Sequence, residues 1–261
     1  MVTLMENEDP KIVCCLTSYP KRIKNCFRVV KSLLENTIVP DRIYLTLARP
    51  QFPNDLDDLP PLLRELVVED PHVFINWVEV NTRIMKKVIP VLPFLDDNDI
   101  IFCCDDDILY PSDYIESRLA DFKAFGGVPL TGCEKQDNRT LFKAWGIPSS
   151  MGLACVFQKR HVENIEKFVD GEVMNANNSD GVYSMVEWLN GYMAHDVTKY
   201  GMEWLRDNRT FNETSPSREN GAYLLGNDIL EVFRKRVCEL TGMDIFDEKS
   251  ALFSKGFFKN G

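Results

Sequence analysis

Three consecutive aspartates, Asp105, Asp106 and Asp107, are the residues of this sequence best suited to chemistry. They directly follow an apolar run over 100–104, so we expect them at the end of a buried strand. Three carboxylates in a partly desolvated place repel one another and require a compensating positive charge. Oxygen ligands suit Mg²⁺ or Mn²⁺, and such an ion keeps positions open for substrate phosphates. The alternative is an acidic surface turn, which is uncommon directly after so apolar a run.

The alternation of side chains along an extended chain assigns different roles within this triplet. Residues two apart point to the same side, so Asp105 and Asp107 would hold one cation between them. Asp106 would point elsewhere and be free to contact the ribose or sugar of a bound donor. We therefore predict Asp105 and Asp107 as metal ligands, and Asp105 and Asp106 as donor contacts.

The segments around the triplet predict an α/β fold with a mostly parallel central sheet flanked by helices. From residue 11 onward, strand-like apolar runs alternate with amphipathic helical stretches. The predicted strands are 12–16, 42–48, 73–80, 99–104, 130–133 and 152–157. The predicted helices are 23–35, 59–67, 83–95, a segment after 111–113, 161–169, 184–201 and 228–240. In open sheets of this kind ligands bind beyond the carboxyl ends of the strands, where the triplet falls.

Four segments carry a resemblance to a known family. The run IIFCCDDDILYP at 100–111 resembles the Asp-x-Asp motif of the GT-A glycosyltransferases. The run LTSYPKR at 16–22 resembles the first strand and nucleotide-contacting loop of a bacterial, family 2-like group of these enzymes. Residues 40–45 resemble their second strand, and 86–90 resemble a lysine-containing helix before the acidic strand. The resemblance covers about 11–114 and is thin beyond it.

This resemblance implies a GT-A fold, that is, a Rossmann-like nucleotide-diphospho-sugar transferase domain. It also implies a metal-dependent glycosyltransferase that uses Mn²⁺ or Mg²⁺. Such an enzyme moves a sugar from a nucleotide-diphosphate donor, with a UDP-linked donor as the expectation, to a hydroxyl of a glycan, a lipid-linked saccharide or another acceptor. The expected division is one domain over 1–261, with a nucleotide-sugar-binding half at about 11–128 and an acceptor-binding half at about 129–261.

Five further residues are predicted donor contacts. Thr17, Ser18, Tyr19 and Arg22 follow the first strand, where hydroxyls and a guanidinium would meet a base, ribose or phosphate. The alternative for this loop is a helix entry with a capping residue and a solvated arginine. Lys87 would neutralise phosphate charge, and its alternative is a helix lysine whose stem lies along the apolar surface.

A general base is the remaining requirement, because the acceptor hydroxyl must lose its proton. In related enzymes an acidic residue at the start of a helix in the second half serves as base, and 194–197 resembles such a position, which makes Asp196 the predicted base. His195 stands where many relatives have a second acidic residue. Glu187 and Glu203 are alternative bases, and Asp196 would otherwise be a helix cap or a surface charge.

Composition excludes several classes of partner. The net charge of −10 argues against nucleic acid as a partner, and no apolar run approaches the roughly 20 residues of a transmembrane segment. The eight cysteines show no C-x-x-C spacing, so we interpret them as buried hydrophobic residues of a reduced, cytoplasmic protein. A lipid-linked acceptor would place it at the inner face of the membrane. Three tryptophans could stack on a sugar or simply pack, namely Trp145, Trp188 and Trp204.

Three other functions compete with sugar transfer. A sugar nucleotidyltransferase normally opens with a glycine-rich phosphate loop, and 17–22 contains no glycine. A phosphatase with an aspartyl nucleophile needs a hydroxyl residue where Leu109 stands. A non-catalytic carbohydrate- or divalent-metal-binding module would use the same carboxylates without a base or a donor.

Overall fold

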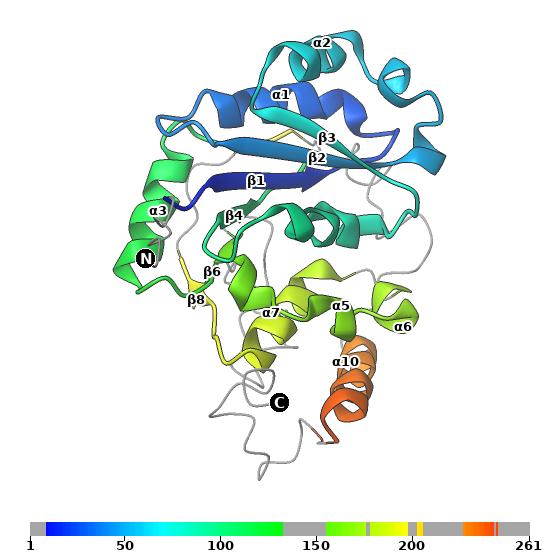
Figure 1. Cartoon of the computed structure of the whole chain (residues 1–261), viewed down its shortest axis with the longest axis vertical. Helices are drawn as coiled ribbons and strands as arrows, with labels where there is room; N and C mark the ends of the chain where they lie inside the picture. Colours follow the sequence, from blue (N-terminus) through cyan, green and yellow to red (C-terminus); the bar gives the residue numbers. More distant parts are fainter. Residues whose placement is uncertain are drawn as a thin grey trace, which may run out of the picture.

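A computed structural model describes residues 9–132, 155–175, 178–197, 203–205, 227–242 and 244, with the backbone alone at 196, 204 and 227–230. Trp145, which could stack on a sugar or pack, and Cys133, in the predicted strand 130–133, lie outside these residues. The described part is a mixed α/β fold with one large sheet (Figure 1). Within it no helix has the length and apolarity needed to cross a membrane.

The central sheet has seven strands in the order β3-β2-β1-β4-β7-β6-β8. In chain order they are β1 (Ile12–Thr17), β2 (Arg42–Ala48), β3 (Val73–Val78), β4 (Ile100–Cys103), β6 (Leu130–Thr131), β7 (Cys155–Gln158) and β8 (His195–Asp196). Neighbouring strands are parallel except where β7 pairs with β4 and β6. The predicted α/β class with a mostly parallel sheet is confirmed.

Burial on both faces explains why the first strands are apolar throughout. One face is covered by α1 (Ile23–Leu34), α2 (Pro61–Glu69) and α3 (Tyr114–Ala124). The other is covered by two 3₁₀ helices, η3 (Arg83–Lys87) and η4 (Ile89–Phe94), and by α5 (Ile165–Phe168) and α7 (Ser179–Leu189). Successive residues of β1 therefore enter different cores, as Cys14 and Cys15 do. Figure 1 shows these helical layers above and below the sheet.

The strand order reverses at β1, and this reversal creates a switch point. The chain passes from β1 to β2 and β3 on one side and then returns to place β4 on the other side of β1. The connections on the two sides lead away from each other, which opens space beyond the carboxyl ends of β1 and β4. Ligands of open α/β sheets bind at such points.

Three predicted helices differ from the structure. The segment 161–169 is divided between a 3₁₀ helix, η5 (Lys159–Val162), and α5, with Asn164 at a φ of 62° between them. The segment 83–95 forms η3 and η4 instead of one helix, because Pro90 and Pro93 lack the N–H groups of a continuous α-helix. The predicted helix over 184–201 is wrong: α7 starts at Ser179 and ends before Gly191, whose φ of 82° stops a helix. The segment beyond it returns to the sheet as β8.

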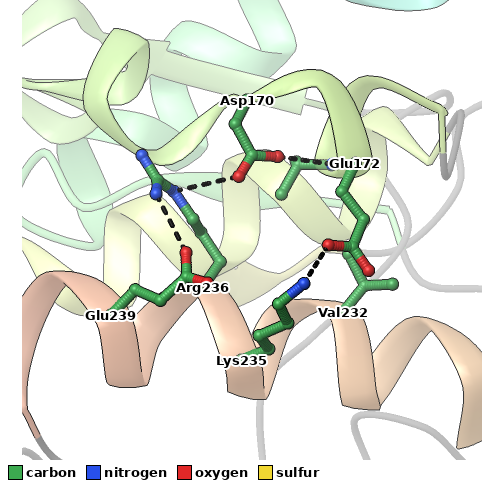
Figure 2. Close-up of a pocket in the computed structure, with 7 residues that line it drawn as sticks. Asp170, Glu172, Val232, Lys235, Arg236 and Glu239 are labelled. Carbon is green, nitrogen blue, oxygen red and sulfur yellow. Dashed lines mark hydrogen bonds and ion pairs between the residues drawn. The ribbon is translucent and has the colours of Figure 1, made fainter.

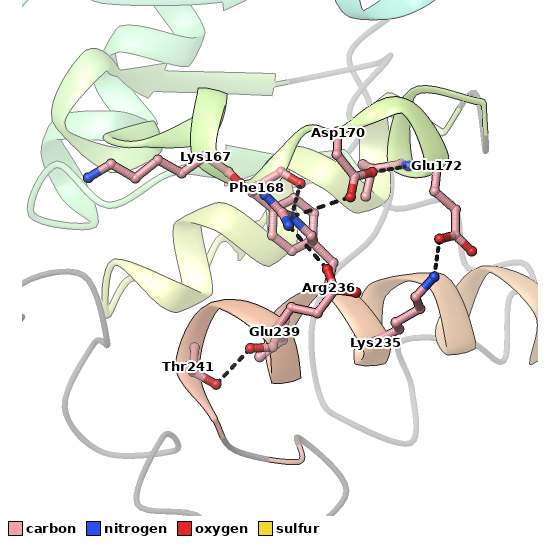
Figure 3. A network of polar contacts seen from close by, with 10 residues as sticks. Lys167, Phe168, Asp170, Glu172, Lys235, Arg236, Glu239 and Thr241 are labelled. Carbon is pink, nitrogen blue, oxygen red and sulfur yellow. Dashed lines mark hydrogen bonds and ion pairs between the residues drawn. The ribbon is translucent and has the colours of Figure 1, made fainter.

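The last described helix, α10 (Asn227–Thr241), joins the fold through apolar residues and a rim of charges. Phe233 is buried against Phe168 of α5. Figure 2 shows a shallow pocket between α10 and α6 (Gly171–Asn175) that is crossed by an ion pair from Lys235 to Glu172, 2.5 Å long. Figure 3 shows Arg236 reaching the end of α5, where its Nε donates to the carbonyl oxygen of Phe168 at 3.1 Å.

Candidate active site

The aspartate triplet and the loop after β1 meet at the carboxyl edge of the switch point. β4 ends at Cys103, and the N–H of Cys104 donates to the carbonyl oxygen of Cys15 in β1 at 2.8 Å. This bond fixes the start of the triplet against the end of β1. The loop 18–22 leaves β1 at the same edge, so both predicted donor segments lie together.

Asp106 and Asp107 are buried, and both form ion pairs with the guanidinium group of Arg22. The nitrogen Nη2 of Arg22 lies 2.5 Å from Oδ1 of Asp106 and 2.7 Å from Oδ2 of Asp107. The hydroxyl of Ser18 donates to the other oxygen of Asp106 at 2.5 Å. The two aspartates are only 6% and 3% exposed. Arg22 and Ser18 therefore join the β1 loop to the triplet, while their predicted role as donor contacts stays a prediction.

Burial and the shared guanidinium act in opposite directions on these carboxylates. Burial raises the pKa of Asp106 to about 6, although the charge of Arg22 opposes the shift. Burial alone would lower the pKa of Arg22, but Asp106 and Asp107 raise it above its ordinary value. Arg22 thus stays charged, while Asp106 gains a proton at about pH 6.

Asp105 has a different partner from the other two aspartates. Its Oδ1 forms an ion pair with Nζ of Lys87, and its N–H donates to the hydroxyl of Tyr110 at 2.8 Å. The side chain of Lys87 is 5% exposed and that of Asp105 is 24% exposed. Burial would lower the pKa of Lys87, but Asp105 holds it well above its ordinary value. The structure thus brings together two residues predicted to contact the donor.

The triplet does not follow the alternation expected of a strand. β4 ends before it and residues 106–107 form a turn, so residues two apart no longer share a side. Asp106 and Asp107 both contact Arg22, and Asp105 alone contacts Lys87. Strand alternation therefore does not decide on which side Asp105 and Asp107 lie, and their role as metal ligands stays a prediction.

A cation at the triplet would have to be held jointly with a substrate. Among the described residues no group of three or more His, Cys, Asp or Glu side chains could hold a metal ion by itself. Mg²⁺ and Mn²⁺ at phosphate sites are typically bound by one or two carboxylates, and substrate phosphates and water complete the shell. Asp105 and Asp107 would be two such carboxylates, and their role as metal ligands stays a prediction.

A row of polar side chains continues the site across the sheet. Thr17, Thr46 and Asn76 are in register on β1, β2 and β3. The hydroxyl of Thr17 donates to the carbonyl oxygen of Thr46 at 2.7 Å, and the amide of Asn76 donates to the Thr46 hydroxyl at 3.3 Å. Sequence reasoning missed Thr46 and Asn76, although polar residues near the ends of successive predicted parallel strands were the available signal.

The carbonyl oxygen of Tyr19 begins α1 beside this row. It accepts from the N–H groups of Arg22 at 2.9 Å and Ile23 at 3.0 Å. The turn holds Arg22 at the helix entry and leaves Tyr19 half-buried in the loop. The predicted residue Tyr19 therefore helps to position the arginine that contacts the triplet.

A second chain segment lies beside the triplet. The short strands β5 (Ile108–Leu109) and β9 (Glu203–Trp204) pair in antiparallel fashion, and the N–H of Leu205 donates to the carbonyl oxygen of Asp107 at 2.8 Å. Glu203 is exposed and pairs with Leu109. One of the alternative bases thus lies on a segment that contacts the site, while the side chain of Trp204 lies outside the described residues.

Asp196 does not occupy the predicted helix start. It belongs to β8, where it pairs with Thr131 of β6, and its side chain lies outside the described residues. Strands β7 and β6 separate β8 from β4, which places its backbone about 14 Å across the sheet from β4 at ~4.8 Å per strand. The helix-start prediction fails because the chain turns at Gly191 and re-enters the sheet.

Asp180 lies at a helix start, which is the kind of position that the sequence analysis expected for Asp196. It is half-buried in the first turn of α7, whose N-terminus is capped where the side chain of Asn178 accepts from the N–H of Gly181 at 2.9 Å. Its charge acts on Lys87 and on Cys103. Sequence reasoning missed it, although Asn-Ser-Asp-Gly before an apolar run is a helix-start pattern.

Glu187 and Trp188 lie deeper on the same helix. Glu187 is 1% exposed, and among the described residues neither of its carboxylate oxygens has a hydrogen-bond partner. Burial raises the pKa of Glu187 well above its ordinary value and so favours the neutral form of this carboxyl. An enclosed carboxyl whose neutral form is favoured is poorly suited to accept a proton from an acceptor. Trp188 packs in the apolar core instead of presenting a stacking surface.

Comparison with known proteins supports this arrangement at the level of the fold. No family model and no curated protein sequence matches the chain. Among solved structures it resembles TarS of S. aureus, with TM-score 0.51, 12% identity, 92% of this chain covered and 46% of that one. It also resembles a mannosyltransferase, PcManGT from Pyrobaculum calidifontis, with TM-score 0.52, 11% identity, 74% of this chain covered and 56% of that one. The chain has the GT-A fold.

The GT-A assignment is one of architecture. The chain spans about half the length of the full TarS structure, and 10% identity to TarS 1–349 in complex with UDP, at TM-score 0.50, is too low to transfer an activity. What the comparison adds is the fold of the sheet whose carboxyl edge holds Arg22 and the triplet in this chain. The fold implied by the sequence resemblance is confirmed.

Proposed function

We propose that this chain is a metal-dependent glycosyltransferase that moves a sugar from a nucleotide-diphosphate donor to an acceptor hydroxyl. The observation that carries the proposal is the set of Asp105, Asp106 and Asp107 with Arg22 and Lys87 at the switch point of a GT-A fold. The structural neighbours support it, since one is in complex with UDP and another with GDP-Man and Mn²⁺.

The donor is proposed to lie across the carboxyl ends of β1, β2 and β4. Asp105 and Asp107 would hold Mn²⁺ or Mg²⁺, which when bound supplies positive charge to the departing diphosphate. Lys87 and Arg22 add fixed positive charge at the same place, and Asp106 keeps Arg22 in position. The loop of Thr17, Ser18 and Tyr19 and the polar row beside it would contact the nucleoside, with a UDP-linked donor as the first choice.

The transfer itself requires one bond to form and one to break. The acceptor oxygen bonds to the anomeric carbon, the bond from that carbon to the diphosphate oxygen breaks, and the hydroxyl proton passes to a carboxylate. We assign this carboxylate to Asp180 in place of Asp196. Asp180 lies at a helix start, is partly exposed, and lies near enough for its charge to act on Lys87.

The proposal extends to the class of acceptor and to the cellular compartment. A glycan or a lipid-linked saccharide would present the hydroxyl, and a lipid-linked one would bring the protein to the inner face of a membrane. The described cysteines are free thiols, six of them buried, which favours a reducing compartment such as the cytoplasm. Nucleic acid remains an unfavourable partner for a chain with a net charge of −10.

Donor binding with and without metal tests the proposal. The purified protein would be titrated with UDP- and GDP-linked sugars in the presence of Mn²⁺, Mg²⁺ or EDTA. Donor hydrolysis and sugar transfer would be measured from the amount of nucleoside diphosphate released. Asp105→Asn and Asp107→Ala would be compared with Asp97→Asn, whose side chain is 79% exposed. We expect Asp105→Asn and Asp107→Ala to lose metal-dependent donor binding. Asp97→Asn should bind the donor as the wild type does.

The alternatives predict different outcomes. A sugar nucleotidyltransferase would release or consume a nucleoside triphosphate instead of releasing a nucleoside diphosphate. A carbohydrate- or metal-binding module would bind its ligand without hydrolysing any donor. If no sugar nucleotide is bound or hydrolysed with metal present, and Asp107→Ala changes nothing, the glycosyltransferase proposal is wrong.

A further inference from the structure

Two adjacent lysines of η3 are both buried, but their charges are compensated differently. Lys87 forms an ion pair with Asp105. Lys86 is equally buried, at 4% exposed, yet its Nζ contacts two neutral oxygens, Oδ1 of Asn81 at 3.2 Å and the carbonyl oxygen of Arg83 at 3.0 Å. Within the described residues no carboxylate lies at ion-pair distance from Lys86. An ammonium group has three N–H donors, so these two contacts leave one unused.

A buried ammonium without a counter-ion is costly and calls for an explanation. Its desolvation is not repaid by two neutral acceptors, and burial accordingly lowers the pKa of Lys86 to about 8. A lysine placed only for packing would extend its head to solvent, as lysine stems normally allow. The head of Lys86 is instead fixed inside the loop that enters η3.

The position of Lys86 points to the ligand that would compensate it. η3 packs against β1 and β2, whose carboxyl ends carry Thr17 and Thr46, and the charge of Asp106 acts on Lys86. The electrostatic effect of Asp106 therefore indicates that Lys86 lies near the end of the sheet where the donor is proposed to bind. Arg22 and Lys87 balance two of the three carboxylates of the triplet. A bound divalent cation would offset the two charges of a diphosphate, so one negative charge would still be in excess.

We propose that Lys86 is a phosphate-binding residue of the donor site, held in place before binding and compensated by the diphosphate of the nucleotide. This inference rests on the proposed function and assigns the site one further residue. A preformed cation loses little freedom when the ligand arrives, so its charge-assisted hydrogen bond contributes directly to affinity.

The test compares a nucleotide with its nucleoside. Lys86→Met removes the charge and keeps the length of the side chain, Lys86→Arg keeps the charge, and Lys235→Met is the matched control that removes an exposed lysine on α10. UDP, GDP and the nucleosides uridine and guanosine would be titrated calorimetrically into each variant, with Mn²⁺ and with EDTA. Circular dichroism and thermal unfolding would check that each variant is folded.

We expect Lys86→Met to weaken binding of the nucleoside diphosphate about tenfold or more, with and without Mn²⁺. Nucleoside binding should be unchanged, and Lys86→Arg should retain most of the affinity. Equal weakening of nucleotide and nucleoside would show a structural role and overturn the proposal, as would wild-type UDP and GDP affinity in Lys86→Met. Failure of the wild-type protein to bind any nucleoside diphosphate would overturn the proposed function and this inference together.

Discussion

The two halves of the molecule handle buried charge in opposite ways. In the sheet half, carboxylates are buried in pairs with cations that come from distant parts of the chain, as Asp106 with Arg22 and Asp105 with Lys87. In the helical half, the buried carboxyl of Glu187 has no hydrogen-bond partner among the described residues, and the paired charges of α10 lie on the surface. Buried carboxylates with cation partners are thus found at the switch point.

Topology explains this contrast. Parallel strands deliver several loops to one edge, so residues far apart in sequence meet and can compensate one another. The helices of the second half pack mainly through apolar faces, and their short connections bring fewer polar groups together. Asp180 belongs to the helical half, yet its charge acts on Lys87 of the site.

The largest expected effect tests whether Asp180 belongs functionally with the sheet half. Asp180→Asn should lower the rate of transfer by about a thousandfold, because general base catalysis typically contributes 10²- to 10⁴-fold. Donor affinity should stay close to the wild-type value, since the amide keeps the size of the carboxylate. Single-turnover kinetics with the donor and acceptor identified by the titrations would measure both quantities.

Asp196→Asn and Glu203→Gln are the matched controls for this change. If Asp196→Asn abolishes transfer while Asp180→Asn leaves it intact, the original sequence assignment is right and ours is wrong. A large loss in Glu203→Gln alone would move the base to the segment beside β5. Either result would remove Asp180 as the link between the two halves.

The same contrast explains which parts of the fold could be predicted. Uninterrupted apolar runs predicted β2 with the bounds that the structure has, Arg42–Ala48. Helical spacing predicted α1 over 23–35, and its observed end at Leu34 differs by one residue. In the second half, apolar residues such as Tyr192 and Met193 extend the pattern of α7 past Gly191, so the helix was predicted too far along the chain. Local patterns failed where a single glycine ends an element.

The site was predictable in its residues but not in its pairings. The triplet, Arg22 and Lys87 were selected from residue type and position after strands, and the structure brings them together. No sequence pattern specifies that Arg22 would contact both Asp106 and Asp107, because that contact depends on the turn after β4. Asp180 was missed because the helix was predicted to begin at Ser184, after its true start at Ser179.

The second prediction tests the compensation of charge in the sheet half. Arg22→Met would leave two buried carboxylates without their cation, so we expect a loss of about 3–5 kcal/mol in the free energy of unfolding. Urea unfolding at pH 7.5 would measure it. Arg64→Met is the control, because its pair with Asp57 is exposed and should matter little. Similar losses in both variants would contradict the proposed role of the buried pair.

The third prediction concerns the buried acid of the helical half. The pKa of Glu187 is higher in the folded than in the unfolded protein, so the folded state binds the proton more tightly. Its contribution to stability is therefore complete below the unfolded pKa, about 4.5, and is lost as pH rises above it. Glu187→Gln removes this pH dependence. Its stabilising effect relative to the wild type should therefore grow as the pH rises, by up to about 1.4 kcal/mol per pH unit.

Urea unfolding at pH 5 and pH 7 would measure the effect in the wild type, in Glu187→Gln and in the exposed control Glu172→Gln. We expect a small gain for Glu187→Gln at pH 5 and a larger one at pH 7, with no such trend in the control. A gain that is the same at both pH values would show that Glu187 does not titrate on unfolding, and a loss would show that it has a partner.

The smallest expected effect lies at the rim of the helical half. Arg236 joins α10 to α5 through the backbone carbonyls of Lys167 and Phe168, and it also pairs with Glu239 on its own helix. Since the pair is partly exposed, Arg236→Met should cost only about 1 kcal/mol, most of it from the lost carbonyl contacts. Thermal unfolding in low salt and in about 1 M NaCl would separate the two terms, because salt screens the ion pair and spares the hydrogen bonds. A cost as large as that of Arg22→Met would mean that surface charges hold α10 as firmly as buried ones hold the site, and the contrast between the two halves would then not hold.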